Sequence, residues 1–320
     1  MLRHGAPATQ ILGVGSFQPE KRVTNDDLSK IMDTNDEWIR DRVGIIERRV
    51  AGPDEQVVDF AAAAGQRALR DAGVSGSDLD AVIVATCTLP NQIPNAAARV
   101  AHRVGATGVG AFDVNAACAG FCYALNTASE LIRSGSAEHV LVLGAEKLTD
   151  WVEPTDRSNA IIFADGAGAA VVGPSDEPRI GPVFWGSAGD LADLIYMRDK
   201  RWLYQEGQSV FRWATTQIAP VALRALELAG LKPADVDVLV AHQANLRIVQ
   251  HIAKKLRAEG ASDDMVVADD IQYSGNTSSA SIPMALDHMR AAGRVSRDDV
   301  LLFVGFGAGL SYAAQAVICP

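Results

Sequence analysis

Two cysteines in the segment "DVNAACAGFCYAL" are the first candidates for chemistry. Cys118 and Cys122 stand four residues apart, where the apolar stretch "GAFDV" gives way to a helical pattern. We expect Cys118 in the first turn of that helix, where free N–H groups and the positive end of the dipole favour a thiolate and can lower a cysteine pKa to about 3.5–7.5. The residues around Cys118 are small, which leaves space for a substrate. Cys118 is therefore the predicted nucleophile.

Two other interpretations of Cys118 remain open at this point. A buried structural thiol is the commoner fate of a single cysteine. A metal site would need further ligands, and the cysteines at 87, 118, 122 and 319 form no second pair, with no close pair of histidines beside them. We expect no metal here.

A histidine and an asparagine are the next candidates. His242 follows the buried-strand pattern "VDVLVA", and Asn276 stands in "YSGNTSSASIPMAL", where a strand again meets a helix. Alone, His242 would be a core histidine and Asn276 an Asx turn or helix cap. Together with the thiol they supply a nucleophile and two polar groups for an enolate or oxyanion. The glycine turn "GFGAGL" from Gly305 adds backbone N–H groups that we expect beside Cys118.

These candidates belong to a duplicated chain. The segment from Ala68 to Cys87 resembles the segment from Ala225 to Ala244, 157 residues later. A second pair, "RSGSAEHVLVLGAE" and "AAGRVSRDDVLLFVGFG", has nearly the same offset. Two pairs in the same order predict two copies of one fold.

The offset also predicts where the candidates lie. It carries Ala85 onto His242, and an offset of about 158 carries Cys118 onto Asn276. All three polar groups would then lie at corresponding strand ends, near the pseudo-symmetry axis, where open α/β sheets place their sites.

Each copy alternates amphipathic helices, such as Val57–Ala72, with short apolar strands, such as Ala81–Ala85. This pattern predicts an α/β fold of buried, largely parallel sheets covered by helices. The turn-rich segment 174–182 separates the copies, so we expect tightly packed halves at 1–173, carrying the cysteine, and 174–320, carrying the histidine and asparagine.

Composition limits the classes of function. The chain has 320 residues, with 29 Lys and Arg against 39 Asp and Glu, a net charge of −10 that disfavours nucleic acid. Few, irregularly spaced cysteines and no signal-peptide pattern predict a cytoplasmic protein. The uncharged stretch from Val300 to Cys319 has the length of a membrane span, but its glycines predict two buried strands around a turn.

Six motifs in order resemble the β-ketoacyl-acyl-carrier-protein synthase III family, the chain-initiating ketosynthases of the thiolase fold. They are "TNDEWIRDRVGI", "AACAGFCYAL", "PTDRSNAIIFADGAGAAVV", "HQANLRI", "GNTSSASIP" and "GFGAGLSYAAQ". The resemblance covers nearly the whole chain. It implies two βαβαβαββ halves stacked as α-β-α-β-α layers, and neither metal nor redox cofactor.

The resemblance implies an acyltransferase that initiates fatty acid or type II polyketide chains. Cys118 would accept an acyl group from an acyl-CoA. His242 and Asn276 would then stabilise the enolate formed when malonyl-acyl-carrier-protein loses carbon dioxide, and this carbanion would attack the acyl-cysteine. The backbone N–H groups of Cys118 and Ala308 match the oxyanion hole, with Phe306 beside the nucleophile.

Further residues match the family's binding surfaces. Trp38 and Arg42, with Arg157 and Asn245, resemble its coenzyme A channel, which suits the planar fork of arginine. A basic face on an acidic protein would steer the acidic carrier protein to the site. Its residues are Arg212, Arg247, Lys254, Lys255 and Arg257.

Two departures from the family bear on the starter acyl group. Ile93 stands where acetyl-preferring members place a phenylalanine that enters the acyl pocket of the partner subunit, so this expectation presumes a homodimer. A smaller side chain predicts a longer or branched starter. The connection from Leu191 to Gln208 is shorter than in the family, which leaves the starter length open.

Related enzymes of the same fold would carry different residues at two positions of this sequence. A hydroxymethylglutaryl-CoA synthase would carry a glutamate where Cys87 stands, and a chalcone synthase a proline where Ala308 stands. An acyltransferase that passes the acyl group to a hydroxyl or amine without condensation is the closer alternative. A decayed, non-catalytic carrier-protein-binding module is disfavoured by the intact nucleophile.

Overall fold

The computed structural model describes residues 5–320, which form two five-stranded sheets and two short ribbons. The first sheet contains β1 (Ala8–Phe17), β7 (Asp165–Ser175), β6 (Val140–Lys147), β4 (Ala81–Ala85) and β5 (Gly110–Val114), in that order. The second contains β12 (Val266–Val267), β11 (Val238–Ala241), β13 (Val300–Gly307), β14 (Ser311–Ile318) and β8 (Phe184–Ser187). The ribbons are β2 (Arg22–Thr24) with β3 (Glu47–Arg49), and β9 (Ile195–Arg198) with β10 (Trp202–Gln205).

The two sheets have the same strand order. Reading the second sheet from its other edge gives β8-β14-β13-β11-β12, which matches β1-β7-β6-β4-β5 by chain order within each half. This confirms the duplicated fold. The chain passes from one sheet to the other between Ser175, the end of β7, and Phe184, the start of β8.

The expectation of largely parallel sheets is wrong for half of the strand pairs. β4 is parallel to β5 and β6, whereas β6–β7 and β7–β1 are antiparallel, and the second sheet repeats this arrangement. A continuous apolar run indicates burial on both faces but not direction. The direction is set by the connection between strands. β13 and β14 are joined by a short turn without a crossover helix, and such a turn can join only antiparallel neighbours.

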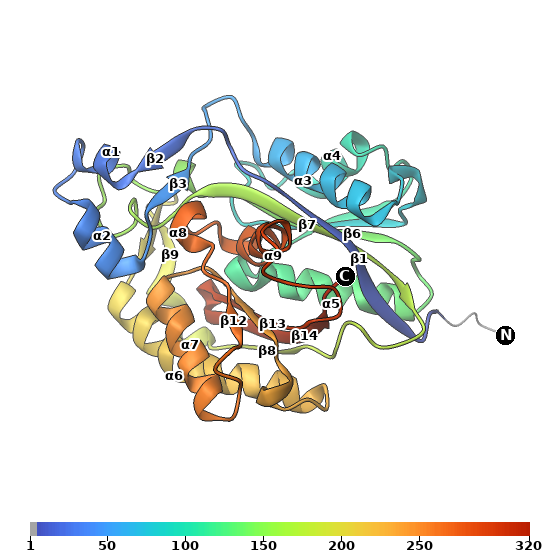
Figure 1. Cartoon of the computed structure of the whole chain (residues 1–320). Helices are drawn as coiled ribbons and strands as arrows, with labels where there is room; N and C mark the ends of the chain where they lie inside the picture. The colour runs from blue at the N-terminus through green and yellow to red at the C-terminus, as the bar shows by residue number, and fades with distance from the viewer. Residues whose placement is uncertain (1–4) are drawn as a thin grey trace.

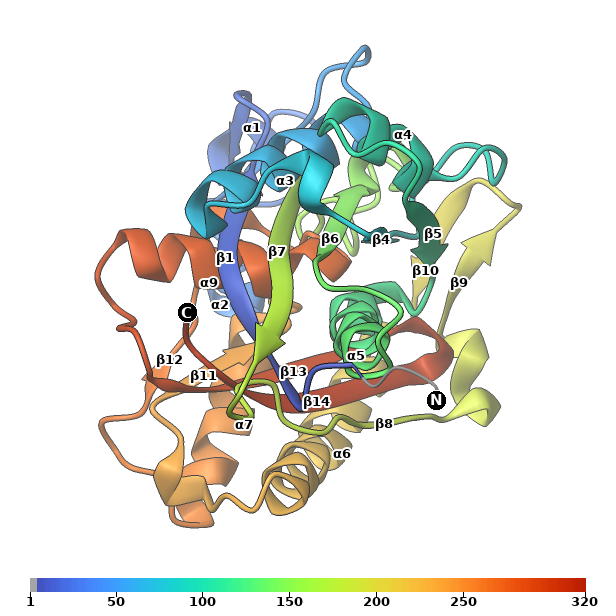
Figure 2. The same cartoon turned by 90° about the vertical axis from the view of Figure 1, so that its right-hand side faces the viewer.

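Helices cover both sheets in three layers, which gives an α-β-α-β-α stack (Figures 1 and 2). Helices α3 (Val57–Ala72) and α4 (Ala96–Arg103) cover the outer face of the first sheet, and α6 (Gly207–Leu228) and α7 (Leu246–Ala258) that of the second. Between the sheets lie α5 (Gly120–Arg133) and α9 (Ser281–Ala291), which contact both. Each layer has its own apolar cluster.

The central helix α5 is held in place by the apolar residues of both sheets. Phe121 and Leu125 are completely enclosed, and the Phe121 ring packs against Phe303 of β13 at 6.3 Å between centroids. Burial of such side chains stabilises by roughly 1.5–3 kcal/mol each. The start of α5, and with it Cys118, is therefore fixed between the two sheets.

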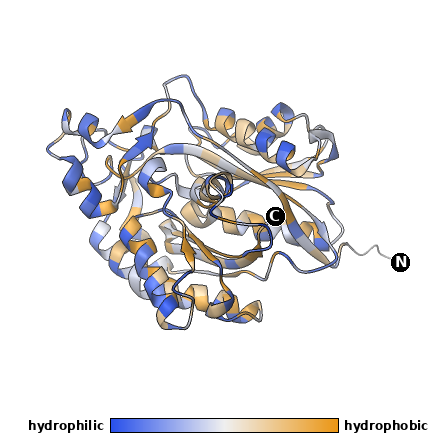
Figure 3. Cartoon of the chain, viewed as in Figure 1, coloured by the Kyte–Doolittle hydropathy of each residue, from blue (hydrophilic) through white to orange (hydrophobic). Residues whose placement is uncertain are grey.

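A more hydrophilic arm lies beside this core and carries α1 (Asn25–Ser29) and α2 (Asp36–Val43), which are largely blue in Figure 3. The short helix α8 (Ile271–Ser274) leads into the loop of Asn276. The described part of the chain contains no helix of the length and hydropathy needed to cross a bilayer. The uncharged C-terminal stretch forms β13 and β14, as predicted.

Candidate active site

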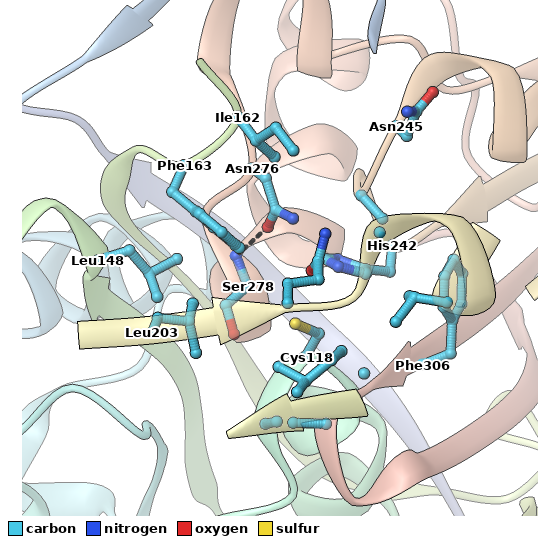
Figure 4. A pocket seen from close by; sticks show the side chains of 18 of the residues that line it. Cys118, Leu148, Ile162, Phe163, Leu203, His242, Asn245, Asn276, Ser278 and Phe306 are labelled. Carbon is cyan, nitrogen blue, oxygen red and sulfur yellow. Dashed lines mark hydrogen bonds between the residues drawn. The ribbon is translucent and has the colours of Figure 1, made fainter. Parts of the chain in front are cut away.

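The three predicted polar groups meet in one cavity of about 1270 Å³. Cys118, His242 and Asn276 line it together with Phe306 and Ala308, and Figure 4 shows the side chains of the first four around the same space. Cys118 comes from the first half of the chain and the other four residues from the second. The cavity is therefore built across the pseudo-symmetry axis.

Cys118 lies in a one-turn 3₁₀ helix, Ala117–Ala119, immediately before α5 rather than inside its first turn. Ala117 has a positive φ of 46°, a conformation unusual for a residue with a side chain. Strand β13 passes close behind: a Cβ on Gly307 would lie 2.8 Å from Cys118 Cβ and 2.9 Å from its backbone nitrogen. Glycine is required there to let the backbone reach the nucleophile.

The expected low pKa of Cys118 is wrong for the unliganded protein. Burial raises the pKa of its thiol to about 12, and Glu146 acts in the same direction, whereas the neighbouring Ser278 hydroxyl lowers it. The effect of burial between the sheets on the thiol pKa is larger than the opposite effect of the N-terminal end of α5. The resting group is a protonated thiol, so its proton must leave when the sulfur forms a new bond.

His242 is enclosed and neutral. Burial lowers the pKa of its imidazole to about 3, and only 1% of the residue is exposed. Its Nδ1 lies 2.7 Å from Ser281 Oγ, and its ring meets the Phe306 ring edge-on at 5.3 Å. The remaining nitrogen, Nε2, is the one left for a substrate in the cavity.

Asn276 presents its amide nitrogen. Its Oδ1 accepts a hydrogen bond from the Ser278 backbone N–H at 2.8 Å, drawn as a dashed line in Figure 4. With the oxygen engaged, Nδ2 is free to donate. The backbone of the loop is fixed by Asn276 N to Ile162 O and by Ala164 N to Asn276 O, both at 2.9 Å.

The predicted equivalence of Cys118 and Asn276 is wrong by three residues. The 3₁₀ turn before α9 is Ser278–Ala280, and the matching turn before α5 is Ala117–Ala119. Aligning the two turns makes Asn115 the counterpart of Asn276 in the first half. Both asparagines accept a hydrogen bond from the backbone N–H two residues later, that of Ala117 at 3.3 Å and that of Ser278 at 2.8 Å. The turn and helix start, rather than the strands, set this register.

Sequence reasoning missed several polar residues at the site. Gln243 is fully buried and links the end of β11, which precedes His242, to α8, which precedes Asn276. Its Nε2 donates to Ala241 O, and its Oε1 accepts from the N–H of Ile271 in α8. Ser278 is also buried and lines the cavity beside Cys118. The cluster of hydroxyls in "TSSAS", directly after Asn276, was the available signal.

A second thiol also lines the cavity. Cys87 follows β4, and its Sγ lies 3.5 Å from Glu146 Oε1. Burial raises the pKa of Glu146, a carboxyl that accepts hydrogen bonds from Thr88 Oγ1 at 2.7 Å and Ser279 Oγ at 2.8 Å. Burial and Glu146 raise the pKa of Cys87 as well, so this thiol is a weak nucleophile.

The four predicted coenzyme A residues line the same cavity. The guanidinium of Arg157 lies 3.9 Å from the centre of the Trp38 ring, and that of Arg42 5.9 Å. Asn245 caps α7 through Arg247 N at 2.9 Å, and its Nδ2 donates to Arg42 O at 3.2 Å. Two arginines and an indole face are suited to a nucleotide that carries phosphates.

Of the other residues predicted for the site, some line the cavity and others lie outside it. Arg212 and Arg247 line the cavity and are exposed, whereas Lys254 and Lys255 lie further along α7, outside the lining. Ile93 is 87% exposed and is not among the lining residues of this chain.

The 191–208 connection forms the β9–β10 hairpin, whose Ile195, Met197 and Leu203 form part of the cavity wall. Arg257, also expected on the basic face, instead donates to Met265 O at 3.0 Å. Residues 5–320 contain no cluster of three or more metal-ligating side chains, and the absence of a metal or cofactor stays a prediction.

Fold and site together define a thiolase-fold condensing enzyme, with a cysteine, a histidine and an asparagine on two duplicated halves. Solved structures share this fold over nearly their whole length. The priming β-ketosynthase of the R1128 polyketide pathway superposes with a TM-score of 0.95 at 42% identity, covering 100% of this chain and 98% of that one. The 3-oxoacyl-[acyl-carrier-protein] synthase III of Aquifex aeolicus gives 0.92 at 40%, covering 97% and 100%.

Sequence comparisons narrow the class to one family. The family described as 3-oxoacyl-[acyl-carrier-protein] synthase III matches residues 112–189, and its C-terminal part matches 226–319. The chain is 49% identical over 316 residues to β-ketoacyl-[acyl-carrier-protein] synthase III 4 of Streptomyces coelicolor, covering 98% of this chain and 99% of that protein. This chain belongs to the β-ketoacyl-acyl-carrier-protein synthase III family.

Proposed function

We propose that this protein condenses an acyl-CoA starter with malonyl-acyl-carrier-protein and so initiates fatty acid or type II polyketide chains. The reaction gives a 3-ketoacyl-acyl-carrier-protein, carbon dioxide and free coenzyme A. The observation that carries the proposal is the convergence of Cys118, His242 and Asn276 on a cavity whose lining also includes Trp38, Arg42 and Arg157.

In the first step, Cys118 Sγ attacks the thioester carbonyl of the acyl-CoA. The thiol proton passes to the departing coenzyme A thiolate, and the new bond is an acyl-cysteine thioester. The backbone N–H groups of Cys118 and Ala308 are suited to stabilising the oxyanion, because the approach of Gly307 brings the end of β13 next to the nucleophile. Trp38, Arg42, Arg157 and Asn245 hold the nucleotide.

In the second step, the malonyl group loses carbon dioxide and its electron pair becomes an enolate. Asn276 Nδ2 and the neutral imidazole of His242 stabilise the negative charge on the enolate oxygen. The carbanion attacks the acyl-cysteine carbonyl and expels the Cys118 thiolate, which takes up a proton from solvent. No metal or redox cofactor takes part.

The partners and setting follow from the same proposal. Arg212 and Arg247 flank the cavity and would attract the acidic carrier protein, with Lys254 and Lys255 further along α7. The protein acts as a homodimer in which Ile93 closes the partner's acyl pocket. All four cysteines are free, which suits a reducing cytoplasm.

Intact-mass measurement tests the proposal. The protein is incubated with acyl-CoAs from acetyl to medium and branched chains, with Cys118→Ala as the control, and malonyl-acyl-carrier-protein is then added. We expect one acyl mass that requires Cys118 and that disappears as the 3-ketoacyl product forms. An adduct that never condenses would favour the non-condensing acyltransferase, and no adduct from any donor would remove Cys118 from the chemistry.

A further inference from the structure

The contact between Ser281 and His242 determines what the imidazole can do. Ser281 is the first residue of α9, and its Oγ lies 2.7 Å from His242 Nδ1. Both residues are about 1% exposed. The same oxygen accepts the backbone N–H of Gln243 at 3.3 Å. On the other side of the ring, no partner occupies Nε2 among residues 5–320.

The position of the ring proton follows from a count of donors and acceptors. A neutral imidazole has one N–H, and the other nitrogen accepts. Ser281 has a single hydroxyl hydrogen, and within the described chain Nδ1 is the only acceptor in reach, since the Gln243 contact uses a lone pair of the oxygen. The hydroxyl must therefore donate to Nδ1, which leaves the N–H on Nε2.

The duplicated half supports a special role for this pair. When the two halves are aligned on their 3₁₀ turns, Ser281 at the start of α9 corresponds to Gly120 at the start of α5. When they are aligned on their strands, His242 corresponds to Ala85. Gly120 and Ala85 are neighbours too, because a Cβ on Gly120 would lie 3.0 Å from Ala85 Cβ. The contact is apolar in the first half, between Gly120 and Ala85, and polar in the second half, between Ser281 and His242. The fold of the first half therefore forms at this position without a hydroxyl.

We propose that Ser281 is a positioning residue that holds His242 in the Nε2–H tautomer, so that the imidazole donates a hydrogen bond into the cavity beside Asn276 Nδ2. Two donors then converge on the oxygen of the enolate. The inference rests on the proposed function, because it assigns Ser281 to the decarboxylation and condensation step and not to the transfer of the acyl group onto Cys118.

Nuclear magnetic resonance of the protein labelled with ¹⁵N-histidine tests the tautomer directly. The His242 signals are assigned as those lost in His242→Gln. We expect a protonated Nε2 and a hydrogen-bonded, unprotonated Nδ1 at neutral pH, with an exchange toward the Nδ1–H form in Ser281→Ala. A protonated Nδ1 in the unmodified protein overturns the proposal whatever the variants do.

Two half-reactions test the consequence. In Ser281→Ala we expect acylation of Cys118 within about threefold of the unmodified protein and malonyl decarboxylation and condensation reduced by about 10–100-fold, as for other residues that orient a histidine. Ser281→Thr keeps the hydroxyl and should restore the Nε2–H signal and most of the condensation. Ser129→Ala is the matched control: Ser129 is also buried, but its hydroxyl pairs with Thr9 Oγ1 at 2.7 Å.

The outcomes separate this inference from the proposed function. Equal loss of both half-reactions in Ser281→Ala, or full condensation with the Nε2–H signal retained, contradicts a positioning role. If the unmodified protein forms no 3-ketoacyl product, the proposed function fails, while the tautomer assignment is still decided by the histidine spectrum.

Discussion

The Cys118 thiol must give up its proton in the course of its attack, and its enclosed position opposes that loss. The N-terminal end of α5 and the Ser278 hydroxyl favour the thiolate, but burial has the larger effect and raises the pKa of the Cys118 thiol to about 12. Under the proposed function the proton leaves as the new C–S bond forms, and the coenzyme A thiolate that is expelled takes it up.

Alkylation of Cys118 should rise about tenfold per pH unit from pH 6 to 9. A thiol far below its pKa reacts through a thiolate fraction that grows by this factor. Peptide mass spectrometry after short treatment with iodoacetamide measures the rate, and Cys122, whose pKa burial also raises to about 12 but which lies outside the cavity lining, is the internal control. A rate that levels off below pH 8 would show that the helix end has the larger effect after all.

The residue types at the site were predictable from the sequence because Cys118 and His242 each follow a strand and Asn276 precedes a helix. Their surroundings were not. The Ser281 and Gln243 hydrogen bonds join segments about 40 and 30 residues apart, and no periodicity predicts which buried hydroxyl faces a given ring. The thiol pKa was predicted in the wrong direction because local helix position is visible in a sequence and enclosure is not.

At the scale of elements, strand β13 sets the space around the nucleophile. Gly307→Ala places a methyl group 2.8–3.0 Å from Cys118 Cβ, N and Sγ, so the strand or the cysteine must move. We expect acylation to slow by at least about tenfold, since small displacements of reacting atoms are costly, with a loss of stability of about 1–3 kcal/mol. Rates from intact mass and a thermal melt measure both.

The control for this substitution is Gly189→Ala, whose added Cβ meets no atom within 4 Å. It should leave acylation and the melting temperature close to those of the unmodified protein. Equal activity of the two variants would mean that β13 does not constrain Cys118.

A second pair of elements, α9 and α8, is joined by His288. Its Nδ1 lies 2.7 Å from Asp270 Oδ1, at the start of α8, and its Nε2 3.2 Å from Ser16 Oγ of β1. Burial lowers the pKa of His288, but the hydrogen bond to Asp270 and the charges of Asp270 and Asp287 outweigh it, so the pKa is raised above 6.5. The charged pair holds the loop that carries Asn276.

The stabilisation from His288 should depend on pH. A raised pKa in the folded state contributes stability that is fully present below about 6.5 and is lost as the pH rises through the folded value. The melting temperature of His288→Gln should therefore fall further below that of the unmodified protein at pH 6 than at pH 9. His102→Gln, a change on the surface of α4, is the control, and a gap that widens at pH 9 would contradict the assignment.

Individual elements were predicted better than their relations. Val57–Ala72 and Ala81–Ala85 form as predicted, because apolar periodicity is a local property. Strand direction and the offset between the halves depend on the connections. Both copies contain a three-residue 3₁₀ turn, but the second copy also contains α8 before that turn, so the offset of the strands does not hold there and Asn276 aligns with Asn115 rather than with Cys118.

For the whole molecule, the expected homodimer remains to be tested. Ile93 is an exposed apolar side chain beside a cavity that includes its neighbour Gln92. Sedimentation should give twice the mass of the chain, and Ile93→Phe should shift acylation toward short starters by filling the partner's pocket. A monomer at assay concentration, or an unchanged starter preference, would contradict this arrangement.

The cavity described above connects Cys118 with Arg42 and Arg157 through one continuous space, and under the proposed function the same space must also admit the arm of the carrier protein. Coenzyme A therefore has to depart before the second substrate arrives. Steady-state kinetics should follow a ping-pong order, with parallel lines in double-reciprocal plots, and free coenzyme A should compete with the malonyl carrier for the acylated enzyme. The rate of chain initiation would then respond to the ratio of acyl-CoA to free coenzyme A.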